Sequence, residues 1–132
     1  MKHQIQPIGS GEFTYEANCE WAQWPADWQV SEVTAVATDS RDRVFVFNRG
    51  DHPVAVFDPG GQPLFSWGAG LFVRPHGIWI GPDDAVYLTD DLDHTVHKFT
   101  PEGERLWTLG TSGKPSRASA AALPCRFVLA SS

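Results

Sequence analysis

The stretch Asp42-Arg43-Val44-Phe45-Val46 returns 42 positions later as Asp84-Ala85-Val86-Tyr87-Leu88. The same offset, without a gap, also aligns His52-Pro53-Val54 with His94-Thr95-Val96. Farther along the chain it aligns the segment that starts at Phe57 with the segment that starts at Phe99. Each copy holds four short apolar runs separated by Asp, Gly and Pro residues, a pattern typical of antiparallel strands joined by tight turns. The chain is therefore expected to contain two similar β units in succession.

The apolar runs predict eight strands rich in β-branched and aromatic residues. They are Val33–Thr38, Val44–Phe47, Pro53–Phe57 and Leu64–Trp67, followed by Gly77–Ile80, Val86–Thr89, Thr95–Phe99 and Leu106–Leu109. A period near 40 residues with four strands per unit is typical of β-propeller blades, of which a closed ring has four to eight. We therefore expect an all-β fold that forms an incomplete β-propeller, with about two four-stranded blades and an N-terminal strand.

The turn sequences between these strands support the prediction. Asp58-Pro59-Gly60-Gly61 and Thr100-Pro101-Glu102-Gly103 place proline at the second position and glycine where a positive φ is needed. Gly81-Pro82-Asp83-Asp84 is expected to form a similar turn between the first two strands of the second unit.

The composition excludes several classes of protein. Of the 132 residues, 42% are hydrophobic and 12% aromatic, which is enough for a packed core. The net charge of −6 argues against binding to nucleic acid or to anionic membranes, both of which require a basic surface. No apolar run approaches the ~20 residues that span a bilayer. The start lacks the apolar segment of a secretory signal, which favours a cytoplasmic location. Cys19 and Cys125 are interpreted as free thiols, with a disulfide as the alternative.

Four segments are expected along the chain. Residues 1–29 form an N-terminal segment whose one or two strands, from Phe13 to Trp24-Pro25, complete an outer edge. Residues 30–70 and 71–111 are the two blades, and residues 112–132 form an irregular tail. The tail lacks the strand pattern where a third repeat should begin, so it is interpreted as a truncation or frameshift product, with a short helix over Ser119–Leu123 as the alternative.

Two loop positions differ between the copies and are therefore candidates for chemistry. His76 stands where the first copy has Thr34, and Arg49 stands where the second copy has Asp91. In a four-stranded meander, the loop entering the first strand and the loop between the second and third strands lie at the same end. We therefore expect His76 and Arg49 to lie at one rim, near the mouth of the propeller channel. The alternative is that His76 is an ordinary loop residue.

Other candidates are weaker. His52 and His94 occur in both copies and are interpreted as packing or turn residues. His94 and His97 point to opposite faces of a strand, so one metal ion cannot easily take both. The acidic cluster that starts at Asp90 is interpreted as a solvated turn, and Gly110–Lys114 lacks the spacing of a phosphate loop.

Two motifs resemble those of the NHL-repeat propellers related to the peptidyl-hydroxyglycine amidating lyase. They are Val44-Phe45-Val46-Phe47-Asn48-Arg49-Gly50-Asp51-His52 and Phe72-Val73-Arg74-Pro75-His76-Gly77-Ile78. The resemblance implies a six-bladed propeller that splits a C-terminal hydroxyglycine into a peptide amide and glyoxylate. It also implies a zinc ion held by three histidines from separate blades, each in a Pro-His motif.

Four residues take roles by this resemblance. His76 matches one zinc ligand and Arg49 matches an arginine of the substrate pocket. Val36 and Ile78 match positions whose backbone carbonyls bind a structural calcium. Zinc would ease deprotonation of the substrate hydroxyl, and arginine would neutralise a carboxylate. The other histidines and the catalytic tyrosine of the family would lie in blades beyond these two.

Three functions follow as alternatives. The chain is interpreted first as a fragment of a metal-dependent, lyase-like propeller that is inactive alone. The second is a noncatalytic NHL-type module that binds a protein, a peptide or a small molecule, and the third is a structural remnant. The expected partners are the remaining blades of a propeller or further copies of the chain, with no nucleic acid and no membrane.

Overall fold

The computed structural model describes residues 7–116, which form ten strands and no helix. The first sheet has the order β3-β4-β5-β6, and the second has the order β10-β9-β8-β7. The strands of the first sheet are β3 (Val33–Thr38), β4 (Val44–Asn48), β5 (Val54–Phe57) and β6 (Pro63–Trp67). Those of the second are β7 (Pro75–Ile80), β8 (Val86–Asp90), β9 (Thr95–Phe99) and β10 (Arg105–Leu109). All pairs are antiparallel.

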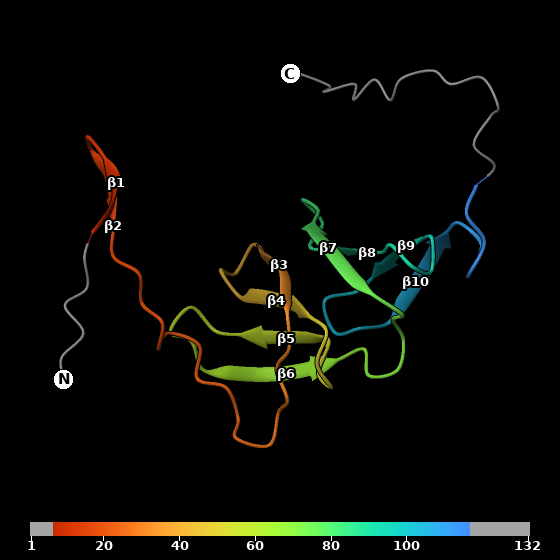
Figure 1. Cartoon of the computed structure of the whole chain (residues 1–132), viewed down its shortest axis with the longest axis horizontal. Helices are drawn as coiled ribbons and strands as arrows, with labels where there is room; N and C mark the ends of the chain where they lie inside the picture. Colours follow the sequence, from red (N-terminus) through yellow and green to blue (C-terminus); the bar gives the residue numbers. More distant parts are fainter. Residues whose placement is uncertain (1–6, 117–132) are drawn as a thin grey trace.

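The two sheets lie side by side, with β7 next to β3, and the described residues form no closed ring (Figure 1). This confirms the expected all-β fold and incomplete propeller. All eight predicted strands are present, with bounds that differ by at most two residues from those predicted. Both sheets even share their irregularities, since the register shifts at Thr34 in β3 and at His76 in β7.

The main core lies between the two sheets. From the first sheet, Phe45, Phe47, Val54 and Val56 are fully buried, and from the second sheet Val86, Leu88 and Phe99 meet them. Trp67 packs on Phe99 at 4.8 Å between ring centroids. Alternation along each strand explains the pattern, because every second side chain points to the same face.

The turns confirm the chemistry expected from the sequence. Gly61 and Gly103 close their turns by donating to the carbonyls of Asp58 and Thr100, each at 3.0 Å, and both have positive φ. In the turn that begins at Gly81, the residue with positive φ is Asp84, at 59°. Asp84 also accepts two hydrogen bonds from Ser40, so the turn links the two sheets.

The N-terminal segment differs from the prediction. A small hairpin of β1 (Ile8–Ser10) and β2 (Phe13–Tyr15) lies apart from both sheets (Figure 1). One or two strands were predicted from Phe13 to Trp24-Pro25. β2 lies at the start of this range, but the continuation of strand structure to Trp24-Pro25 is wrong, because the stretch from residue 16 to residue 25 has no sheet partner. Its aromatic rings instead pack on a sheet face: Trp21 and Trp24 both contact Phe57.

Cys19 is exposed and has no disulfide partner among the described residues. Cys125, the tail from residue 117 and the alternative helix over Ser119–Leu123 lie outside the part of the chain that the structure describes. Within residues 7–116 no helix is present that could cross a membrane.

Candidate functional site

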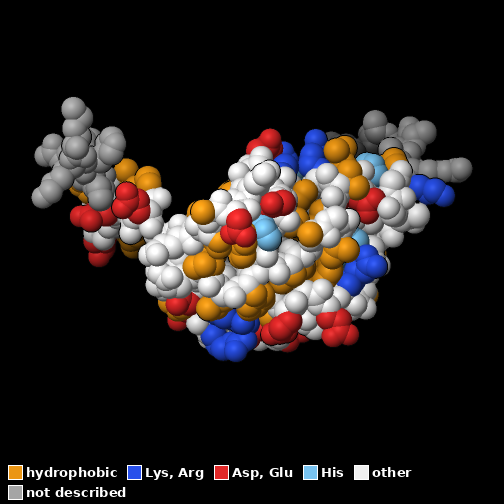
Figure 2. Space-filling model, turned by 90° about the horizontal axis from the view of Figure 1, so that it is seen from below, with side chains coloured by type: hydrophobic (Ala, Val, Ile, Leu, Met, Phe, Trp, Pro, Cys, Tyr) orange, Lys and Arg blue, Asp and Glu red, His pale blue; other side chains and the backbone are white. Residues whose placement is uncertain are grey.

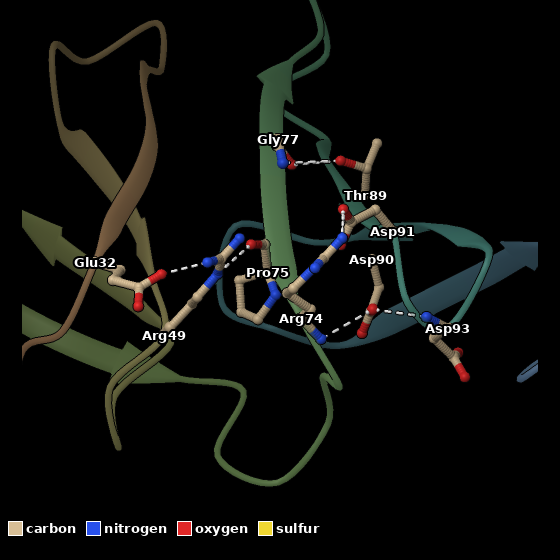
Figure 3. A network of polar contacts seen from close by, with 9 residues as sticks. All are labelled: Glu32, Arg49, Arg74, Pro75, Gly77, Thr89, Asp90, Asp91 and Asp93. Carbon is tan, nitrogen blue, oxygen red and sulfur yellow. Dashed lines mark hydrogen bonds and ion pairs between the residues drawn. The ribbon is translucent and has the colours of Figure 1, made fainter.

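Arg49 and the Pro75-His76 motif come together at one rim of the molecule. Arg49 follows β4, and its Nε donates a hydrogen bond of 3.2 Å to the Pro75 carbonyl at the start of β7. The rim is drawn in Figure 3, where the Arg49 side chain extends from the first sheet toward β7. His76 comes directly after Pro75 and is exposed. The meander topology thus brings the two sequence-predicted residues to the same end of adjacent sheets.

Arg49 is held by two contacts. Besides the Pro75 carbonyl, one of its terminal nitrogens pairs with the carboxylate of Glu32, which precedes β3. The Arg49 side chain is 30% exposed. Among the described residues its other terminal nitrogen makes no hydrogen bond, so one edge of the guanidinium can still meet a carboxylate from solution.

A second ion pair lies beside His76. Arg74 donates from Nε to one oxygen of Asp91 at 2.6 Å and from a terminal nitrogen to the other oxygen. The hydrogen bond from Arg74 is the main reason that the pKa of the Asp91 carboxyl is lowered to about 2, and the nearby charges of Arg74, His76 and Arg49 act in the same direction. The same hydrogen bond raises the pKa of Arg74. Both groups therefore stay charged across the physiological range.

The backbone of the segment before His76 is held in place by hydrogen bonds to the Asp90 carboxylate. This carboxylate is 1% exposed and accepts hydrogen bonds from three backbone N–H groups, at 2.5 Å from Val73, 3.0 Å from Arg74 and 3.0 Å from Asp93. Figure 3 shows Asp90 between the loop of Arg74 and the turn of Asp93. The Gly77 N–H donates to Thr89 Oγ1 at 2.8 Å. His76 is the extra residue of a β-bulge, a device that redirects a side chain at the end of a strand.

The rim contains two equivalent ion pairs, one in each unit, which were not predicted from the sequence. Positions 32 and 49 of the first unit correspond to positions 74 and 91 of the second, and both sets form an ion pair. The signs are reversed: Glu32 with Arg49, but Arg74 with Asp91. The signal was present in the internal alignment, because both positions change sign together between the copies.

Val36 and Ile78 occupy equivalent places on β3 and β7, opposite Val46 and Leu88 in their sheets. Val36 is 61% exposed, and Ile78 packs at the edge of the core. Both lie on the two strands, β3 and β7, that adjoin each other. These two residues do not by themselves form a cage of the six to eight oxygen ligands that calcium takes.

The donor set in the described residues does not fit a zinc centre on its own. Within residues 7–116 no group of three His, Cys, Asp or Glu side chains lies close enough to share a metal ion. Catalytic zinc takes three protein ligands, and this rim offers one histidine beside a carboxylate already bound by Arg74.

The other three histidines within residues 7–116 have structural roles. His52 stacks on Trp28 at 4.3 Å and hydrogen-bonds Ser66 Oγ, while His94 has a positive φ of 58° in a turn. His97 is buried between Thr95 and Thr108, to whose hydroxyls its two ring nitrogens are hydrogen-bonded. The interpretation of His52 and His94 as packing and turn residues agrees with these contacts.

Comparisons with known proteins agree with the resemblance to NHL-repeat propellers. The chain is 29% identical to the peptidyl-alpha-hydroxyglycine alpha-amidating lyase 1 of Drosophila melanogaster over 70% of the chain and 22% of that protein. It is 30% identical to the peptidylglycine alpha-amidating monooxygenase of Rattus norvegicus over 83% of the chain and 14% of that protein. It is 32% identical to the NHL repeat-containing protein 3 of Mus musculus over 69% of the chain and 29% of that protein.

The chain resembles the amidating-lyase branch of the NHL-repeat propellers. No family model matches it. The match covers less than a third of each of these relatives, which are considerably longer proteins. The chain is therefore related to NHL-type propellers of the amidating-lyase kind. This similarity concerns the fold and does not extend to the reaction of the longer relatives.

Proposed function

We propose that this chain supplies two adjacent blades of a lyase-like propeller that acts on the C-terminal end of a peptide, and that it is inactive alone. The observation that carries the proposal is the contact of Arg49 with the Pro75 carbonyl, which joins the arginine of one blade to the histidine motif of the next. Its relatives include proteins named for peptide amidation, which supports a peptide substrate.

Each rim residue has a role in this proposal. Arg49 is the catalytic residue that would meet a substrate carboxylate through its remaining edge, because a planar guanidinium matches a carboxylate in two places. His76 would be one zinc ligand, completed by histidines of further blades, and the carbonyls of Val36 and Ile78 would contribute to a calcium site. Zinc supplies a positive charge that eases deprotonation of a bound hydroxyl. Asp90 and the Arg74–Asp91 pair hold the segment before His76, and Thr89 holds the Gly77 N–H directly after it.

The second candidate is a noncatalytic binding module that uses the same rim. One observation favours it: Arg49 already has an ion-pair partner in Glu32, and the matched pair of the second unit is likewise closed by Arg74 with Asp91. The charge of Arg49 is therefore neutralised within the fold without a substrate. In that case the rim would bind a protein or peptide without any dependence on zinc.

Binding measurements on the chain separate the two candidates. We expect a short peptide with a free C-terminal carboxylate to shift the NMR signals of the rim and the same peptide as its amide to shift them less. Arg49→Ala should remove the difference, while Lys114→Ala, a cation outside the rim, should leave it. Equal binding of the acid and the amide would refute a carboxylate role for Arg49.

Zinc titration tests His76 separately. We expect added zinc to perturb the His76 ring signals weakly, and His76→Ala to abolish the effect, with His52→Ala as the matched control. Glyoxylate release from a peptidyl hydroxyglycine should stay at the rate in buffer, because one histidine does not complete a zinc site. Zinc shifts confined to other histidines would remove His76 from the site, and release of glyoxylate by the chain would refute its inactivity alone.

A further inference from the structure

The outward side of the second sheet carries an aromatic and aliphatic surface that no described residue covers. We name it the open face and define it by seven side chains: Trp79, Tyr87, Thr89, Val96, Lys98, Trp107 and Leu109. They alternate with the inward side chains along the strands, so they share one side of the sheet. Trp79, Trp107 and Leu109 are 57%, 44% and 65% exposed. Hydrophobic side chains also form a band across the side of the molecule seen in Figure 2.

The equivalent face of the first sheet is buried against the second sheet. The residues 42 positions earlier are Ala37, Phe45, Phe47, Val54, Val56, Phe65 and Trp67. They form the side of the first sheet that packs on the second sheet, and four of them are fully buried. The open face is therefore the equivalent of a sheet-to-sheet interface, and it continues the interface that the structure already contains.

The opposite side of the first sheet is closed. Trp21 and Trp24 lie against Phe57 with centroid distances of 6.0 and 4.8 Å, and Trp28 belongs to the same cluster. Phe57 and Ala55 beneath them are fully buried. A second copy cannot repeat the packing of one sheet on the next, because its first sheet is already covered by these tryptophans.

We propose that the open face of this chain is an interface with a second copy, and that two open faces pack on each other in a closed dimer. One accessible sheet face per chain gives a self-complementary contact with two-fold symmetry, since a head-to-tail contact would need two different free faces. In a longer protein, a further sheet would use the same face. The proposal concerns assembly and does not depend on the lyase-like function.

The side chains favour one direction of the two-fold axis. Across the sheet, the row runs Trp79 on β7, Tyr87 on β8, Lys98 on β9 and Trp107 on β10. An axis parallel to the strands places Trp79 against the partner's Trp107 and Tyr87 against the partner's Lys98. An axis across the strands would place Lys98 against the partner's Lys98, which is repulsive. Within the chain, Lys98 Nζ already lies 5.3 Å from the Tyr87 ring, so this cation–π pair is compatible with the face.

Sedimentation velocity over a range of micromolar concentrations tests the proposal on the full chain. We expect a monomer–dimer equilibrium without larger species. Leu109→Lys and Trp79→Lys should each weaken dimerisation roughly thirtyfold, because each change places a charge in an apolar contact, and aromatic and aliphatic contacts carry most of the energy of an interface. Leu64→Lys is the matched control, since Leu64 is an exposed leucine on the outer strand of the first sheet, 48% exposed, and should leave the dimer unchanged.

Several outcomes would overturn the proposal. A chain that stays monomeric throughout the range has no such interface, and dimers that appear only after residues 117–132 are removed would mean that this segment occupies the face. Dimers weakened equally by Leu64→Lys and Leu109→Lys, or growth into open polymers, would point to pairing of strand edges instead. Near-ultraviolet circular dichroism of each variant shows whether the fold is retained.

Cross-linking tests the direction of the axis. In a chain with Cys19→Ser and Cys125→Ser, Tyr87→Cys mixed with Lys98→Cys should form disulfide-linked dimers under mild oxidation more readily than Lys98→Cys alone. Faster linking of Lys98→Cys with itself would contradict the axis along the strands.

Discussion

The two sheets share a backbone but differ in what covers them. The first sheet is packed on both sides, by the second sheet and by the N-terminal tryptophans. Within residues 7–116, the second is packed on one side only. At matched positions the buried Phe45 and Val56 of the first sheet become Tyr87 and Lys98 in the second. The repeat therefore specifies strands and turns, while the surroundings decide which side chains each position can hold.

The largest difference should appear at the matched aromatic pair Phe45 and Tyr87. Phe45 is fully buried between the sheets, so Phe45→Ala should lower the free energy of unfolding by about 3–5 kcal/mol, as truncation of a buried aromatic residue does. Tyr87→Ala removes a ring from the open face and should cost about 1 kcal/mol. Urea unfolding at low protein concentration measures both. Equal losses would mean that Tyr87 is as well covered as Phe45.

A second matched pair should show that equivalent buried residues are not exchangeable. Asn48 and Asp90 are each 1% exposed. Asn48 donates from Nδ2 to the carbonyl of His52 at 2.8 Å, whereas Asp90 only accepts. Asn48→Asp sets a carboxylate against that carbonyl, and Asp90→Asn leaves at least one N–H without an acceptor, because an amide has a single oxygen.

Each of these two exchanges should destabilise the fold by about 1–3 kcal/mol, the cost of an unsatisfied buried polar group. Urea unfolding again gives the measurement, and Asp27→Asn, at an exposed position, is the control. If either exchange were neutral, a rearranged loop or a bound water would have to satisfy the freed group.

The sheets should also differ in their response to acid, because His97 stands where the first sheet has Ala55. Burial, followed by the charge of Arg105, lowers the pKa of His97 below 6.5, although Asp93 and Asp90 act in the opposite direction. The unfolded chain therefore binds this proton more readily than the folded one. The stability that neutral His97 provides is fully present above pH 6.5 and is lost as the pH falls toward the lower folded value.

Urea unfolding curves measured above and below pH 6.5, for the wild-type protein and for His97→Ala, test this loss of stability in acid. The wild-type protein should lose stability over this interval, and the variant should lack that step even though it starts from a lower stability. A titration of the His97 ring by NMR at or above 6.5 would contradict it.

The sequence predicted the parts of the fold that repeat. The eight strands and the turns at Asp58 and Thr100 follow from local signals, namely alternating β-branched residues and fixed Pro and Gly positions. The N-terminal tryptophans carry no such period. Trp24 is positioned by contact with Phe57, more than 30 residues away, and a contact of this kind has no local signature in the sequence.

For the candidate site, the placement of the residues was predictable from the sequence, but their contacts were not. Strand direction was enough to place Arg49 and His76 at one rim, because topology alone fixes the end of a sheet at which a loop lies. The partners of Arg49 were not predicted, since Glu32 and the Pro75 carbonyl come from two different loops. The repeat contains no segment equivalent to the tail, so the tail could not be predicted from it. The repeat also offers no further ligands for a metal ion beside His76.

The smallest effect is expected at the reversed ion pairs, and it bears most directly on the role of Arg49. Exposed pairs contribute about 0.2–1 kcal/mol, so a double-mutant cycle over Glu32→Gln and Arg49→Gln should give a coupling energy in that range. The cycle over Arg74→Gln and Asp91→Asn is the comparison, measured by urea unfolding at low and high salt. Because Arg74 binds Asp91 with two hydrogen bonds, its coupling should be the larger. If the Glu32–Arg49 pair proved the stronger one, Arg49 would be primarily a structural residue, and the case for its meeting a substrate carboxylate would be weakened.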